Sequence, residues 1–115
     1  MNVFQRHVRE WVTSVLGRES MEDKDIRNHR FLEEAVELVQ ANHCTEEEAH
    51  RIVSYVFSRK SGFIPQEAGG VMVTLAALLA CLDVDMDVAA EVEFMRAWNN
   101  ADKIREKDAH KPRFK

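Results

Sequence analysis

The sequence predicts an all-α protein, an antiparallel bundle of four or five helices. Apolar residues recur at helical rather than alternating spacing along most of the chain. The 115 residues include only 2 prolines and 4 glycines, so few segments are marked as loops. No repeat or linker divides the chain, and its apolar content of 45% is enough for one core. We therefore expect a single helical domain over residues 1–115, with a basic C-terminal tail from about residue 106.

Two helices are predicted in the first third of the chain, over residues 2–16 and 25–41. The apolar residues of the first share one face, and Gly17 is placed to end it. The second is apolar around most of its circumference, which is typical of a buried helix. Three glutamates interrupt that apolar surface, namely Glu33, Glu34 and Glu37.

A third and a fourth helix follow. Thr45 and Glu48 have the spacing of a capping box, so they predict a helix start. Pro65 is suited to open the next helix, over residues 66–82. Its second half is the most hydrophobic segment of the chain, so we expect it to form the core, with Cys81 buried. Adjacent glycines in its first half cost helix stability and would be tolerated if something packs closely there.

The fifth predicted helix begins near Asp85 or Asp87, either of which can act as an N-cap. It continues through Ile104 into the basic tail, where a frayed, solvated end is the ordinary expectation. The two broadly apolar helices, 25–41 and 66–82, offer more apolar surface than one small monomer can hide. We therefore expect a homodimer or a homotetramer.

Charge, apolar segments and cysteine content each exclude some classes of protein and some kinds of site. A net charge of −4 argues against general binding to nucleic acid, which needs a basic face. The N-terminus has no apolar core of a signal peptide. The longest uncharged stretch, residues 68–82, is shorter than the roughly 20 residues of a membrane span. Two cysteines without CxxC spacing indicate neither a disulfide framework nor a zinc site. We expect a cytoplasmic protein with no membrane or nucleic-acid partner.

The glutamates are the candidate functional residues. Glu34 and Glu37 lie three residues apart and therefore share one helix face. Glu67 begins the most hydrophobic helix, near its positive N-terminal end. Carboxylate oxygens from two core helices would suit a hard cation, Mg²⁺ or Mn²⁺. The alternative is that these glutamates are only surface charges, because the same spacing is common on solvated helix faces.

Two segments together carry a family resemblance. Residues 33–38, Glu-Glu-Ala-Val-Glu-Leu, and residues 66–71, Gln-Glu-Ala-Gly-Gly-Val, are followed by the apolar run that begins at Thr74. The combination resembles the all-α nucleoside triphosphate pyrophosphohydrolase superfamily, which includes MazG-like proteins and dimeric dUTPases. The likeness covers roughly residues 25 to 105, and is strongest to a small bacterial and phage subgroup of uncharacterised MazG-like proteins. It implies the helical bundle of that superfamily and Mg²⁺-dependent hydrolysis of a nucleoside triphosphate to a monophosphate and pyrophosphate.

The resemblance implies roles for individual residues. Glu34 and Glu37 match the family's ExxE metal ligands, and Glu67 matches the first residue of its ExxD motif. Glu33 matches an acidic residue that helps orient water, and Glu33 or Glu34 would assist its deprotonation. Gly70 stands where the family has an aspartate, so one metal ligand is absent.

Four further residues are implied in substrate binding. Lys103 and Arg105, which follow Asn99, resemble the family's basic segment and could neutralise the triphosphate. Arg30 lies one turn before the glutamates and could do the same or pair with them. Two other readings stay open: a MazG-like protein that binds nucleotide or metal without turnover because of Gly70, and a helical interaction protein.

Overall fold

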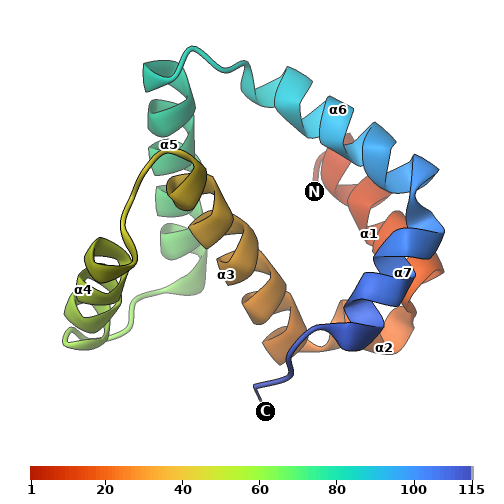
Figure 1. Cartoon of the computed structure of the whole chain (residues 1–115), viewed down its shortest axis with the longest axis horizontal. Coiled ribbons are helices and arrows are strands. Elements are labelled where there is room, and N and C mark those ends of the chain that lie inside the picture. The colour runs from red at the N-terminus through yellow and green to blue at the C-terminus, as the bar shows by residue number, and fades with distance from the viewer. Residues whose placement is uncertain (115) are drawn as a thin grey trace. The chain divides into compact units, whose positions relative to one another are not determined.

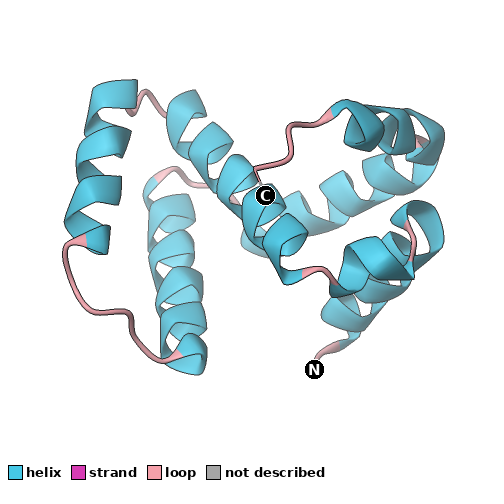
Figure 2. Cartoon of the chain, turned by 90° about the horizontal axis from the view of Figure 1, so that it is seen from below, coloured by secondary structure: helices cyan, strands magenta, loops and turns pink. Residues whose placement is uncertain are grey.

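The computed structural model describes residues 1–114, and this part of the chain consists of helices joined by short loops, without a strand (Figure 2). The all-α prediction is therefore confirmed. The helices are α1 (Val3–Leu16), α2 (Arg18–Glu22), α3 (Lys24–Ala41), α4 (Glu46–Phe57), α5 (Ile64–Cys81), α6 (Met86–Asn99) and α7 (Ala101–His110) (Figure 1).

Contacts within the chain gather into two compact units. Unit 1 combines Met1–Ala35 with the chain from Glu91 onward, and unit 2 is the segment between them, Val36–Ala90. Helices α3 and α6 are each continuous across this boundary. The extensive helix–helix contacts of the described chain are those of α1 with α2 and with α7, all in unit 1 (Figure 1).

Unit 1 has a small hydrophobic core on α1. Trp11, Val12 and Val15 are each only 7% exposed. They are buried because the apolar residues of α1 fall on one helix face, as the sequence predicted. Partly buried side chains from α2, α6 and α7 pack around them, including Met21, Phe94, Ala97, Ala101 and Ile104. Phe94 makes edge-to-face contacts with the rings of Phe4, Trp11 and Trp98.

The ends of α1 are fixed by specific residues. The side chain of Asn2 accepts a hydrogen bond of 2.8 Å from the backbone N–H of Gln5, which caps the first turn. Gly17 ends the helix with a φ of 97°, a conformation that suits glycine, so this prediction is confirmed. Arg105 of α7 donates from Nε to the carbonyl oxygen of Val15 at 3.0 Å, which satisfies one carbonyl in the last turn.

The C-terminal helix differs from the prediction. The expected single helix is divided at Asn100, whose φ of −123° and ψ of 28° leave the helical region. The amide of Asn100 donates to the carbonyl of Arg96 at 2.8 Å, which compensates a carbonyl at the end of α6. Helix α7 then continues to His110, so residues 106–110 are helical rather than frayed. At the other end of α6, Asp85 accepts from the N–H of Val88 at 2.8 Å, as expected of an N-cap.

Unit 2 contains no buried residue, although all of its residues are described. The prediction that α5 forms the core is therefore wrong for the chain by itself, and Cys81 is exposed. Nothing lies within 4 Å of a Cβ built at Gly69 or Gly70, so the close packing that would explain these glycines is absent around them. The two predicted helix starts in unit 2 are confirmed. Thr45 accepts from the N–H of Glu48 at 3.1 Å, and Pro65 lies in the first turn of α5.

Among the described helices, α5 alone is long and apolar enough to cross a membrane by length and composition. Core helices of soluble proteins meet the same criterion.

Candidate functional site

The predicted glutamates are divided between the two units. Glu33 and Glu34 lie on the part of α3 that belongs to unit 1, and Glu37 lies on the part that belongs to unit 2. Glu67 lies in the first turn of α5, also in unit 2. Glu34, Glu37 and Glu67 are exposed, and Glu33 is half-buried. Because α3 is unbroken, Glu34 and Glu37 are separated by about one turn of the same helix.

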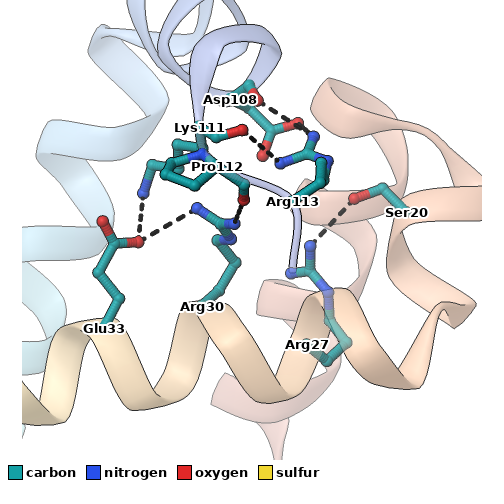
Figure 3. A network of polar contacts seen from close by, with 8 residues as sticks. All are labelled: Ser20, Arg27, Arg30, Glu33, Asp108, Lys111, Pro112 and Arg113. Carbon is teal, nitrogen blue, oxygen red and sulfur yellow. Dashed lines mark hydrogen bonds and ion pairs between the residues drawn. The ribbon is translucent and has the colours of Figure 1, made fainter. Parts of the chain in front are cut away.

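Glu33 is held by two cations (Figure 3). Its Oε1 lies 2.8 Å from Nζ of Lys111 and 3.2 Å from Nη1 of Arg30. The hydrogen bond from Lys111, followed by the charges of Lys111 and Arg30, holds the pKa of Glu33 below its ordinary value. A carboxylate with a lowered pKa is a weaker base. Glu33 therefore suits positioning better than proton abstraction while these pairs are intact.

Residues 111–114 lie against α3 and α7 in unit 1 (Figure 3). Arg30 donates from Nη2 to the carbonyl of Pro112 at 3.1 Å. Arg113 donates to the carbonyl of Asp108 at 3.1 Å and lies 3.6 Å from its carboxylate. The ring of Phe114 meets His29 edge-on, with centroids 5.3 Å apart. The end of the chain is thus attached to the helix that carries the glutamates.

Arg27 completes a group of cations on this side of α3. It donates to the hydroxyl of Ser20 at 3.0 Å, and burial lowers the pKa of its guanidinium. We call Arg27, Arg30, Lys111 and Arg113 the α3 cationic patch. Glu33 and Asp108 contact the patch directly, and the charges of Asp108 and Asp23 act on Arg27.

Glu34 lies in the electrostatic field of a second ion pair in unit 1. Arg96 donates from Nε to both carboxylate oxygens of Glu93, at 3.0 and 2.8 Å. These hydrogen bonds raise the pKa of Arg96, and the charge of Glu34 raises it further. The same contact lowers the pKa of Glu93.

Two glycines, Gly62 and Gly70, lie on either side of Glu67 in the sequence at the start of α5. A Cβ built at Gly62 would lie 3.1 Å from Cδ of Glu67, so the missing side chain makes room for this carboxylate. At Gly70, one turn after Glu67, a Cβ would meet nothing within 4 Å. The first atom of a side chain at position 70 would therefore have room.

Within residues 1–114, no group of three or more His, Cys, Asp or Glu side chains is placed to hold a metal ion. The donor chemistry nevertheless suits Mg²⁺, because Glu34, Glu37 and Glu67 all offer hard carboxylate oxygens. A metal centre made from them requires these carboxylates to converge.

The residues implied in substrate binding all belong to unit 1. Arg30 is bound to Glu33 and Pro112, as described above. Besides its bond to α1, Arg105 pairs with Asp102 at 2.8 Å, so it stabilises the fold. Asn99 and Lys103 are exposed near the junction of α6 and α7.

The sequence did not predict the contact of Lys111 with Glu33 or that of Arg27 with Ser20. Lys111 lies 78 positions after Glu33, and no local spacing relates the two residues. The basic residues after residue 110, with Pro112 and Phe114 between them, were the only signal in the sequence that this segment has partners.

Comparisons with family models, with curated proteins and with solved structures found no match for this chain.

Proposed function

We propose that this protein hydrolyses a nucleoside triphosphate, either NTP or dNTP, to a nucleoside monophosphate and pyrophosphate with the help of Mg²⁺. The observation that carries the proposal is the placement of the glutamates. Glu34 and Glu37 lie on one uninterrupted helix, and Glu67 lies in the first turn of a later helix. This order of motifs is that of the MazG-like proteins that the sequence resembles. The superfamily's bundle and a cytoplasmic location belong to the same proposal.

The proposed reaction is an in-line displacement. Oxygen of a water molecule forms a bond to the α-phosphorus while the bond to the bridging oxygen breaks, and pyrophosphate leaves. Glu34 would take the proton of the water, since the lowered pKa of Glu33 makes Glu33 a weak base. A bound Mg²⁺ would be held by Glu34, Glu37 and Glu67, and would supply charge neutralisation and a more acidic water.

The cations of unit 1 have a role in this proposal. A triphosphate carries several negative charges, and the α3 cationic patch includes Arg27 and Arg30 of the helix that bears Glu34. Arg30 and Lys111 could exchange Glu33 for phosphate oxygens, and Arg30 can do so with two parallel hydrogen bonds. Lys103 and Asn99 are exposed and accessible to a ligand, whereas Arg105 would have to leave Val15.

Two observations favour other functions. Gly70 has no side chain at the position of a family ligand, which favours a protein that binds nucleotide or metal without turnover. The exposed apolar residues of unit 2 favour a helical interaction protein.

One assay distinguishes the enzyme, the protein that binds nucleotide or metal without turnover, and the interaction protein. The full chain is incubated with each NTP and dNTP plus Mg²⁺ or Mn²⁺, and pyrophosphate is measured. Release that is lost in Glu37→Gln and retained in Glu47→Gln supports the enzyme, because Glu47 is an exposed carboxylate on α4 that pairs with Arg51. No release, together with a metal-dependent rise in melting temperature on adding nucleotide, supports the binder. The absence of both effects leaves the interaction protein.

A further inference from the structure

The last described residues of the chain do not continue α7. Lys111 follows the helix with a φ of −70° and a ψ of 145°, which is extended backbone. Pro112 explains this conformation, because a proline disfavours the helical region in the residue before it and has no N–H with which to continue the helix. Residues 111–114 therefore leave α7 as a non-helical segment, which we call the C-terminal strap.

The C-terminal strap contacts one helix, α3, at three places. In order along the strap, the contacts are Lys111 with Glu33, Pro112 with Arg30, and Phe114 with His29. Figure 3 shows the first two. Later residues of the strap contact earlier residues of α3, so the strap runs along this helix toward its start. Every residue in these contacts belongs to unit 1.

Arg30 has an incomplete set of hydrogen bonds beneath the strap. Its side chain is only 15% exposed. Nη1 donates to Glu33 and Nη2 donates to the carbonyl of Pro112, whereas Nε is buried and meets no acceptor within residues 1–114. Nε and Nη2 form one edge of the guanidinium, and these two donors can point in parallel at two oxygens of a phosphate or carboxylate group. One backbone carbonyl satisfies only half of this edge.

Arg27 shows the same deficit. It lies three residues before Arg30 and therefore on the same face of α3. Its Nε is also buried without an acceptor in the described part of the chain. A buried donor without an acceptor costs free energy and is uncommon in folded proteins. Two neighbouring guanidinium groups with unused donors indicate that this side of α3 suits an acceptor with more oxygens than the strap offers.

The contacts that hold the strap are individually weak. The side chains of Lys111 and Glu33 are 29% and 36% exposed, and ion pairs open to water contribute little to stability. The ring of Phe114 is 70% exposed despite its contact with His29. Chain ends with few buried contacts open readily. An anion with several oxygens can therefore compete with the strap for Arg30.

We propose that the C-terminal strap is an autoinhibitory segment, which occupies Arg30 and Glu33 in the free chain and is displaced by the triphosphate of the ligand. The carbonyl of Pro112 stands at Nη2 where a phosphate oxygen would bind. Release of the strap opens both donors of the Arg30 edge and separates Glu33 from Lys111. The choice of a triphosphate rests on the proposed function, whereas the closed strap rests on its own contacts.

Binding of inorganic tripolyphosphate to the full chain tests the strap without metal or catalysis. The double variant Pro112→Gly/Phe114→Gly keeps every charge but loosens the strap, because glycine loses more backbone entropy on docking and the ring is removed. A site that is open in a fraction of the chains has its affinity reduced by that fraction. If the strap is open in roughly one wild-type chain in ten, the double variant should bind up to about tenfold more tightly in isothermal titration.

Two further variants show where the gain arises. Arg30→Lys in the double variant keeps the charge but removes the parallel donors, so it should cancel the gain. Phe63→Gly is the matched control for the loss of a ring, because Phe63 is 68% exposed and lies in unit 2. This control should leave the affinity of wild type unchanged.

Release of the strap can also be followed in wild type by NMR. Titration with tripolyphosphate should move the ring signals of Phe114 toward those of a disordered chain end, because the released ring no longer meets His29. This measurement decides the matter even if the double variant folds poorly. Phe114 signals that stay in place while tripolyphosphate binds would overturn the proposal.

Other results would also overturn it. Equal or weaker binding in the double variant shows that the strap only stabilises unit 1 or lends its cations to the ligand. A gain that survives Arg30→Lys shows that the anion binds elsewhere, and no binding to either chain removes the site. The proposed reaction is judged separately. Tighter tripolyphosphate binding without pyrophosphate release leaves the strap and removes the hydrolysis. Release of pyrophosphate at the same rate and the same KM in wild type and double variant leaves the hydrolysis and removes the inhibition.

Discussion

The two units of this chain form helices equally well but differ in what stabilises them. In unit 1, α1 buries Trp11, Val12 and Val15 against three other helices. In unit 2, α5 is more hydrophobic than α1 but buries nothing. Apolar composition thus does not decide where a core forms. A core forms where several apolar faces meet, and in the single chain only unit 1 provides this.

The comparison also explains where polar contacts accumulate. An ion pair that joins distant segments of the chain, Lys111 with Glu33, lies in unit 1. In unit 2, Glu47 pairs with Arg51 and Glu46 lies near His50, and both contacts join well-exposed residues one turn apart on α4. Exposed pairs of that kind contribute little to stability, about 0.2–1 kcal/mol at most.

The largest expected effect comes from the core of unit 1. Trp11→Ala should lower the free energy of unfolding by about 3–5 kcal/mol, because it removes a buried ring. Trp98→Ala is the matched control in the same unit. Its ring is 52% exposed, so the loss should stay under about 1.5 kcal/mol. Urea unfolding followed by circular dichroism measures both, and equal losses would contradict the assignment of the core.

Restoring a carboxylate in unit 2 should have the next largest effect. Gly70→Asp adds a ligand one turn from Glu67 where the structure leaves room for it, so the affinity for Mg²⁺ should rise about tenfold. Gly69→Asp is the control, because its side chain also has room but projects about 100° away around the helix. Isothermal titration with Mg²⁺ measures both. An equal gain in the two variants would indicate only a general effect of added charge.

Amide hydrogen exchange can show whether the stability of each unit depends on chain concentration. If unit 2 is ordered by a second copy, protection in α5 should rise about threefold for each tenfold rise in chain concentration, by mass action. Protection in α1 should respond less, because its core lies within one chain. Hydrogen exchange with mass spectrometry at several concentrations gives both values. Concentration-independent protection in α5 would argue that unit 2 is stable alone.

A smaller effect is expected at the end of the chain. Lys111→Ala removes the ion pair with Glu33 and should cost about 0.5–1 kcal/mol, because both side chains are only partly buried. Lys107→Ala, on an exposed position of α7, should be nearly neutral. Thermal unfolding of the two variants measures the difference, and a loss above 2 kcal/mol would show that Lys111 has a larger structural role.

The smallest effect is a dependence on pH. The pKa of Glu33 is lowered in the folded chain, so its contribution to stability is present above the ordinary value of 4.5. It should be lost as the pH falls from 4.5 through the lower folded pKa. Carboxyl NMR shifts of Glu33 follow this titration. In Lys111→Ala the Glu33 pKa should move back up, and an unchanged pKa would exclude Lys111 as the cause.

Local signals in the sequence predicted the helices well. Gly17, Thr45 and Asp85 each act through hydrogen bonds or backbone angles within a few residues, so their roles could be read from spacing. The break at Asn100 was missed because apolar spacing continues across it. The burial of α5 was predicted wrongly because hydrophobicity shows which surface needs a partner, but not whether the same chain supplies it.

The candidate site was less predictable than the helices. Spacing placed Glu34 and Glu37 about one turn apart on α3, which the structure confirms. Whether Glu67 joins them is a question of tertiary packing, and the proposed site stays a prediction. The pairing of Glu33 with Lys111 could not be found either, because it depends on where α7 ends.

The order of the units along the chain has a consequence for folding. Unit 1 is built from both ends of the chain, and unit 2 is inserted between them. During synthesis the contacts of α1 with α7 therefore form only after the insert has been made, whereas those with α2 need no later segment. Closing the flexible insert Val36–Ala90 costs about 3.5 kcal/mol in its length-dependent part alone. An insert that is already helical is a stiffer and shorter connection, so early formation of α4 and α5 should speed the joining of the two ends.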